Sequence, residues 1–250
     1  MKSFIFYIFV GIFLPFINGV VVFDNNFNTN KLPSAYSCNY GIFSSALNTF
    51  ITDANIQNLG TNLTTNGNNL QTAINLLLTN AYTTNESTTQ DTFYKLCAAQ
   101  KTFYGKLGYQ NVLGCLNVLN LVTHNYTLND AYLFEQIFTS LNYQCSSGFR
   151  INIAHINDYA FTLVNNATLI GSITNNFYGT INLPSTNDEQ KCSALKKYHN
   201  NMGNLFGKNG KSTEFAYVIC QQYAYYMLIK VPQCYLLTYN CNFNDFLNIN

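Results

Sequence analysis

The segment from Tyr143 to Arg150 holds the best candidate in the sequence for nucleophilic chemistry. Cys145 is followed by two serines, a glycine and the only arginine of the chain, and His155 and Asp158 follow shortly after. A cysteine-dependent hydrolase needs a thiolate within hydrogen-bond reach of an imidazole that a third group orients. Cys145, His155 and Asp158 would fill these three roles. His155 and Asp158 also have the i, i+3 spacing of an ordinary pair on a helix surface.

The cysteine count favours a structural role for Cys145. An even number of cysteines in an exported chain predicts a disulfide framework, and a free nucleophile would leave an odd number to pair. We therefore expect Cys145 to form a disulfide near the end of a helix, with Ser146 to Gly148 as the turn that follows. Eight cysteines allow about 105 pairings, so the partner of each cysteine stays open. The eight cysteines are Cys38, Cys97, Cys115, Cys145, Cys192, Cys220, Cys234 and Cys241.

Other catalytic and metal-binding patterns are missing from the sequence. No C-x-x-C pair, H-E-x-x-H, G-x-S-x-G or phosphate-binding glycine loop occurs. We expect the three histidines, His124, His155 and His199, to lie at the surface or at its rim. The sequence predicts no metal site, no cofactor and no enzymatic activity.

The N-terminus has the features of a secretory signal peptide. Lys2 is followed by an apolar run from Phe4 to Ile17 that only Pro15 interrupts, and Asn18-Gly19 offers a cleavage point. We predict a signal peptide over residues 1–19, although the longer stretch from Phe4 to Phe23 also has the roughly 20 residues of a membrane anchor. Four N-glycosylation sequons agree with a secreted, extracellular protein. Their asparagines are Asn62, Asn85, Asn125 and Asn166.

The charge of the chain limits its partners. Without Lys2, the chain has eleven basic and eleven acidic residues. A neutral chain has no electrostatic footprint for nucleic acid or anionic lipid, so we expect neither nucleic-acid binding nor membrane binding after cleavage.

Apolar periodicity predicts an all-α, disulfide-stapled fold. Residues 91–108 repeat apolar side chains every three or four positions, and residues 111–122 read as a buried helix or a strand. Capping patterns place helix starts at Thr127, Thr186 and Ser212. Polar residues 58–70 and 79–90 read as exposed loops or helix margins.

The mature chain has the length of one domain. We expect an irregular arm over residues 20–37 and a single cysteine-rich helical domain over 38–250. A faint similarity between the segments that follow Cys97 and Cys192 raises the alternative of two related halves, about 38–165 and 186–250.

The C-terminal region suggests how such a protein works. Residues 221–241 contain five tyrosines, which supply amphipathic contact area for a partner. Tyr223, Tyr225 and Tyr226 are the candidate binding residues. The simpler interpretation is that these rings build the core, because the chain lacks tryptophan. The sequence thus favours a secreted, non-enzymatic protein that binds a protein or glycan, with a structural matrix or coat component as the alternative.

Residues 97–149 carry a resemblance to a known family. They read C-A-x-x-x-x-F, then G-C-L, D-A-Y-x-F and Y-Q-C-S-S-G-F. This pattern resembles the uncharacterised cysteine-rich secreted domains found in nematodes. The resemblance implies an extracellular helical domain and transfers no catalytic residue.

Overall fold

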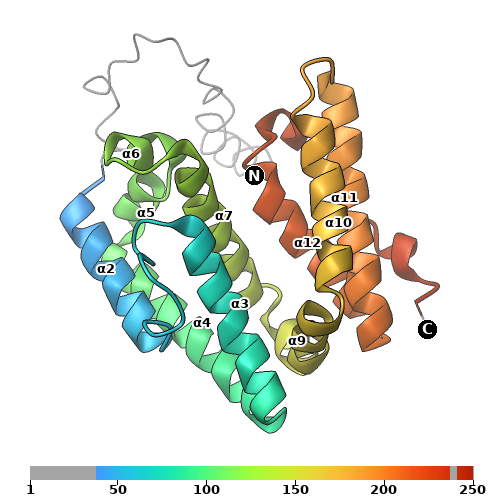
Figure 1. Cartoon of the computed structure of the whole chain (residues 1–250), viewed down its shortest axis with the longest axis horizontal. Helices are drawn as coiled ribbons and strands as arrows, with labels where there is room; N and C mark the ends of the chain where they lie inside the picture. Colours follow the sequence, from blue (N-terminus) through green and yellow to red (C-terminus); the bar gives the residue numbers. More distant parts are fainter. Residues whose placement is uncertain (1–37, 237–240, 250) are drawn as a thin grey trace, which may run out of the picture. The chain divides into compact units, whose positions relative to one another are not determined.

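The computed structural model describes residues 38–236 and 241–249, which belong to one compact unit. These residues form helices and contain no β-strand, which confirms the predicted all-α, disulfide-stapled class (Figure 1). The predicted signal peptide, 1–19, and arm, 20–37, lie outside the described residues. The helices are α2 (Tyr40–Asp53), α3 (Gly67–Thr84), α4 (Ser87–Leu107), α5 (Tyr109–Cys115), α6 (Val118–Thr123), α7 (Leu128–Cys145), α8 (Phe149–Ala154), α9 (Ile156–Asn165), α10 (Ala167–Ile181), α11 (Asp188–Gly210), α12 (Thr213–Leu228), and the 3-10 helices η3 (Pro232–Leu236) and η4 (Phe243–Phe246).

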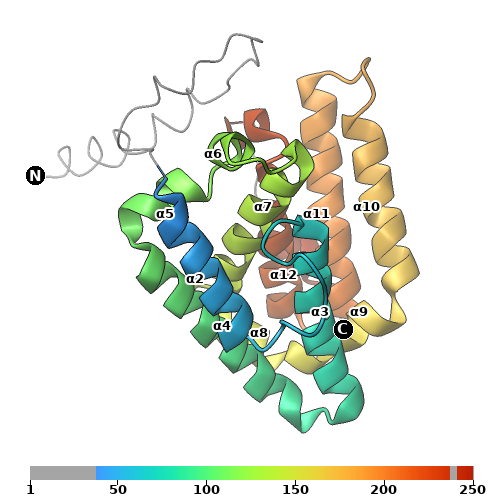
Figure 2. The ribbon, with the colours of Figure 1, turned by 60° about the vertical axis from the view of Figure 1, so that its left-hand side comes forward.

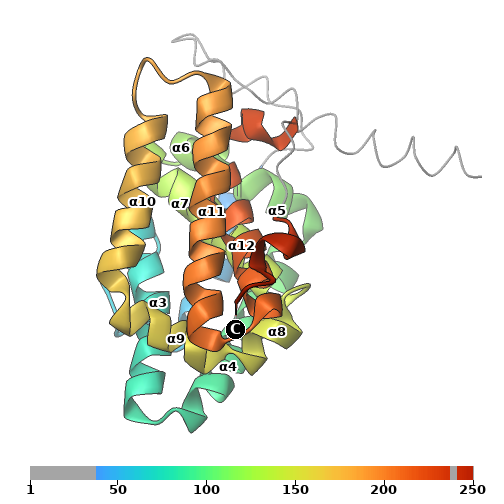
Figure 3. The same ribbon diagram turned by 90° about the vertical axis from the view of Figure 1, so that its right-hand side faces the viewer.

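The helices pack in two groups that meet in the middle of the unit. In the first group α2 packs on α4, and α3 packs on both α4 and α7 (Figure 2). In the second, α11 lies between α10 and α12 (Figure 3). The groups contact each other where α7 meets α12 and where α3 meets α9. A continuous core of buried aromatic and aliphatic side chains runs through both groups.

Helix α4 shows why the periodic segments fold as predicted. Its buried residues include Phe93, Leu96, Gln100, Phe103 and Leu107, which recur every three or four positions and form one face. Packing of such a face supplies most of the stability of a helix in a protein. The helix ends before Gly108, as its sequence predicts, because Gly108 has a φ of 74°, which a residue without a Cβ tolerates best.

Two predicted helix starts are confirmed by their caps, and the third is wrong by one residue. Thr127 accepts a hydrogen bond from the Asp130 amide at the start of α7, and Ser212 caps α12. At α11 the cap is Asn187 rather than Thr186, with Gln190 completing a reciprocal capping box. The Thr186 hydroxyl instead donates to the Thr180 carbonyl at 2.8 Å.

The expected buried element over residues 111–122 is broken into two short helices. Helix α5 ends at Cys115, and α6 starts after Asn117, whose side chain accepts from the Leu119 amide. Much of this segment is only half-buried. The single buried element was therefore a wrong prediction, because apolar composition alone carries no information on an internal Asn cap.

The two polar tracts show both predicted forms, one being mostly a loop and the other helix margins. Residues 79–90 contain the end of α3 and the start of α4, with Asn85 between them. In the tract 58–70, the loop ends at Asn66, which caps α3, and Leu70 is already buried. Composition alone could not tell the two forms apart, because asparagine suits caps and loops equally well.

Four disulfides staple the helices, as the even cysteine count predicts, and no described cysteine is free. Two of them join residues of the first helix group and two join residues of the second group with the C-terminal segment. The bridges are Cys38–Cys115, Cys97–Cys145, Cys192–Cys234 and Cys220–Cys241. None of the described helices has the length and hydropathy that a bilayer-spanning segment requires.

Candidate functional site

The Cys145 motif is a structural turn. Cys145 is the last residue of α7 and its sulfur is bonded to Cys97 of α4. The chain then reverses through Ser146 to Gly148, whose amide donates to the Tyr143 carbonyl at 2.9 Å. Both the predicted disulfide and the predicted turn are confirmed.

His155 and Asp158 form the helix-surface pair that their spacing suggested. His155 Nδ1 lies 2.9 Å from Asp158 Oδ2 at the start of α9, and both side chains keep solvent contact. The imidazole also stacks on the Phe215 ring, with 4.8 Å between centroids. This histidine is therefore held between a carboxylate and a core aromatic ring, and the Cys145 sulfur is engaged in a bridge.

The three candidate tyrosines have different surroundings. Tyr223 and Tyr226 pack against the core, where Tyr223 contacts the rings of Tyr198 and Phe206. Burial raises the pKa of both phenols well above the ordinary value of 10. Tyr225 points outward and is 43% exposed.

Tyr225 belongs to a cluster of rings that the sequence did not reveal. Its ring centroid lies 5.2 Å from that of Tyr143, and the ring of Tyr217 lies 5.9 Å from that of Phe243. The Gln221 amide donates to the Tyr217 hydroxyl at 3.2 Å. We call Tyr143, Tyr217, Gln221, Tyr225 and Phe243 the aromatic face.

Three elements position the aromatic face. Tyr217, Gln221 and Tyr225 recur every four residues and therefore share one side of α12. Tyr143 stands in the last turn of α7, and Phe243 begins η4. The four-residue spacing on α12 was a readable pattern, but the approach of α7 and η4 depends on tertiary packing.

The aromatic face carries no charge of its own. Burial, with the nearby phenols of Tyr217 and Tyr225, raises the pKa of Tyr143 to about 12. The face thus offers ring surface, phenol hydroxyls and one amide at physiological pH. These groups suit stacking and hydrogen bonding to a neutral ligand surface rather than acid–base chemistry.

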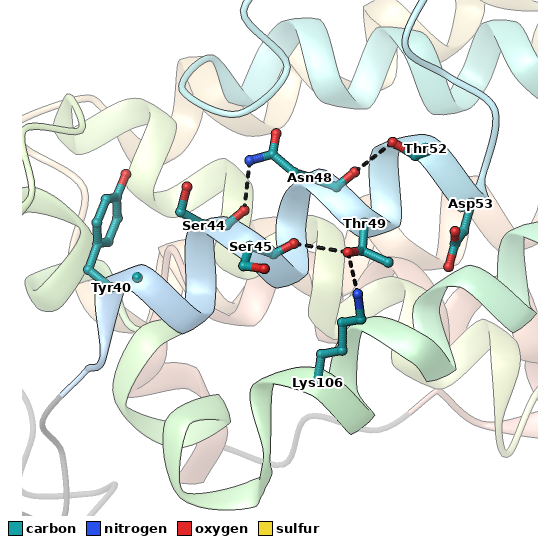
Figure 4. Close-up of a pocket in the computed structure, with 9 residues that line it drawn as sticks. Tyr40, Ser44, Ser45, Asn48, Thr49, Thr52, Asp53 and Lys106 are labelled. Atoms are coloured by element: carbon teal, nitrogen blue, oxygen red, sulfur yellow. Dashed lines mark hydrogen bonds between the residues drawn. The ribbon is translucent and has the colours of Figure 1, made fainter.

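The solvent side of α2 forms an open polar depression of about 870 Å³ (Figure 4). Two of its hydroxyls donate within the helix: Thr49 donates to the Ser45 carbonyl, and Thr52 donates to the Asn48 carbonyl. Lys106 reaches across from α4 and donates to Thr49 Oγ1 at 2.8 Å (Figure 4). The side-chain donors of Thr49, Thr52 and Lys106 are thus used within the protein. We regard it as a solvated helix surface.

His199 corrects the expectation that every histidine lies at the surface or its rim. It is fully buried on α11, with Nδ1 2.9 Å from Cys220 Sγ and 3.4 Å from Cys241 Sγ. Burial lowers the pKa of His199 to about 4, and the positive charge of Lys196 acts in the same direction. The imidazole is therefore neutral at physiological pH.

The four sequons occupy connections between helices or their edges. Asn62, Asn85 and Asn125 are exposed, and Asn62 and Asn125 have the positive φ values common for asparagine in turns. Asn166 is half-buried between α9 and α10, and its Oδ1 accepts from Asn209 at 3.0 Å. None of the four lies on α7, α12 or η4, the elements of the aromatic face.

No family model, curated protein or solved structure matches this chain.

Proposed function

We propose that the chain is a secreted, non-enzymatic protein that binds an extracellular protein or glycan through the aromatic face. The observation that carries the proposal is the meeting of four aromatic rings from three separate elements, with Tyr225 and Phe243 each more than 40% exposed. Tyrosine is enriched at recognition surfaces because its ring gives contact area and its hydroxyl gives a hydrogen bond.

The rigidity of the aromatic face favours binding. The Cys97–Cys145 bridge fixes the last turn of α7, which contains Tyr143. The Cys220–Cys241 bridge fixes the chain just before Phe243. A face that is ordered before association loses less entropy when it binds, and tyrosine has few rotamers to lose. Four bridges also agree with an oxidising extracellular compartment.

The decisive experiment compares tyrosines inside and outside the aromatic face. The Tyr217→Ser/Tyr225→Ser variant should lose binding in a glycan array or in cross-linking to extracellular proteins, while its helical circular dichroism stays unchanged. The control is Tyr94→Ser, because Tyr94 is 61% exposed on α4, outside the aromatic face. Equal binding by the wild type and the double variant would reject this surface.

A core tyrosine provides the second control. Tyr223→Ser should lower the melting temperature, because it removes a ring packed against Tyr198 and Phe206. Loss of binding by this variant would carry no information on the surface unless the protein stays folded.

Sedimentation separates binding from a matrix or coat role. A binder should sediment as a defined monomer or dimer over a wide concentration range. Open-ended assembly that grows with concentration would instead support a matrix component.

Thiol titration addresses the hydrolase alternative. The native protein should show no reactive thiol, because Cys145 is bonded to Cys97. A free, alkylation-sensitive Cys145 whose reactivity is lost in His155→Phe would revive the enzyme hypothesis.

A further inference from the structure

His199, Cys220 and Cys241 bring three potential metal ligands together in the interior. Their donor atoms lie within 4.8 Å of one another, and all three residues are buried. Among the described residues, no other group of three or more His, Cys, Asp or Glu side chains meets in this way. The ligands come from three elements: α11, α12 and the segment before η4.

The two cysteines are bonded to each other in the oxidised chain, so their sulfurs are not ligands in that state. Opening the S–S bond takes two electrons and two protons from a dithiol reductant, which itself becomes a disulfide. The two thiols that result each lose a proton to solvent when a divalent cation binds them.

The geometry fits a tetrahedral ion once the bond is open. Zinc binds sulfur at about 2.3 Å and nitrogen at about 2.0 Å, which puts neighbouring ligand atoms roughly 3.5 to 3.8 Å apart. His199 Nδ1 already lies 2.9 and 3.4 Å from the two sulfurs. The main change needed is a separation of the sulfurs from each other.

We propose that the dithiol form of the chain binds a zinc ion through His199, Cys220 and Cys241. One nitrogen and two thiolates form a donor set that zinc accepts, with a fourth position left for another ligand. Disulfide and metal are then alternative staples for the same C-terminal segment.

Neighbouring polar groups support a metal at this position. Asn200 Oδ1 lies 3.3 Å from Cys220 Sγ, and Asn200 Nδ2 donates to the Asp245 carboxylate at 3.2 Å. Such outer groups commonly orient metal ligands. Phe246 and Ile249 pack with Cys220 and Cys241 in one buried cluster, so the staple fixes how the C-terminal segment covers α12.

Cobalt provides the test, because tetrahedral cobalt bound to thiolates absorbs strongly in the visible and near ultraviolet. The full secreted chain is reduced with a phosphine under nitrogen and titrated with Co²⁺ alone, then with Zn²⁺. We expect saturation at one equivalent of cobalt, displacement by zinc, and helical circular dichroism throughout. His199→Phe and Cys220→Ser/Cys241→Ser should lose the thiolate–cobalt bands, whereas Cys192→Ser/Cys234→Ser should keep them.

A second variant keeps the proposal testable if full reduction unfolds the chain. Cys241→His cannot form the fourth bridge, so the other three can stay oxidised while His199, Cys220 and the new imidazole remain available. We expect this variant to bind one equivalent of cobalt with a single thiolate band. The proposal is overturned if neither chain binds cobalt, or if the His199→Phe substitution leaves binding unchanged in both.

Discussion

Gly207 of α11 lies directly against Ala216 of α12. A Cβ built on Gly207 would stand 2.4 Å from the Ala216 Cβ and 3.1 Å from its Cα. Only a residue without a side chain permits this approach of the two helices, whose packing also positions His199 beside the Cys220–Cys241 bridge.

Gly207→Ala should therefore destabilise the protein. Overpacking of a tight contact costs about 1 to 3 kcal/mol, more than the helix propensity that alanine adds. The controls are Gly105→Ala and Gly179→Ala, where the new Cβ meets nothing within 4 Å, so stability should stay equal or rise slightly. Urea unfolding of the oxidised protein measures the free energy of unfolding of all three variants. An unchanged value for Gly207→Ala would contradict the close contact.

Glu135 should make the protein less stable as the pH rises from about 4.5 to about 7. Enclosure in the fold raises the pKa of this carboxyl from 4.5 to about 7, although the Val118 amide that donates to Oε2 at 3.0 Å partly opposes the shift. Between these values the folded chain keeps a proton that the unfolded chain releases, so the free energy of unfolding falls with rising pH.

Glu135→Gln removes this titration and keeps an acceptor for the Val118 amide. The variant should match the wild type near pH 4 and exceed it near pH 7, by at most about 3 kcal/mol, since one pKa unit corresponds to about 1.4 kcal/mol. Glu189→Gln, at an exposed carboxyl on α11, should not produce this pH-dependent gain. Denaturant unfolding at several pH values tests the slope; parallel curves for wild type and Glu135→Gln would refute it.

His199 should have the opposite effect to Glu135 on the pH dependence of stability. Its folded pKa of about 4 lies below the ordinary 6.5, so the unfolded chain takes up a proton that the folded chain excludes. The contribution of the neutral imidazole to the free energy of unfolding is fully present above pH 6.5 and falls as the pH drops toward 4. NMR of the imidazole protons should show no titration near pH 6.5 for His199. A midpoint near 6.5 would mean that this ring is accessible.

Glycan occupancy should differ among the four sequons. Asn62, Asn85 and Asn125 are exposed and can carry a glycan without disturbing the helices. The Asn166 side chain is half-buried, and its Oδ1 accepts from Asn209, so a glycan on its Nδ2 has less room. Mass spectrometry of protein expressed through a secretory pathway, after enzymatic deglycosylation, should therefore find the lowest occupancy at Asn166. Full occupancy at Asn166 would contradict this expectation.

Local patterns in the sequence determined several of the helices and the presence of the bridges. The spacing of Phe93, Leu96 and Phe103, and the caps at Thr127 and Ser212, depend on neighbouring residues and a helical period, so they can be read without a structure. The even cysteine count likewise predicted disulfides, because it depends on the number of cysteines and not on their positions in space.

Only the tertiary structure decided which residues meet. The partner of Cys145, the burial of His199 beside Cys220 and the approach of Tyr143 to Tyr225 all join residues far apart in the chain. The helical period places Tyr223 and Tyr225 on different sides of α12, but it cannot say which side another helix will cover. That choice follows from the packing of α7 and α11 against α12, which depends on the shapes of all three surfaces together.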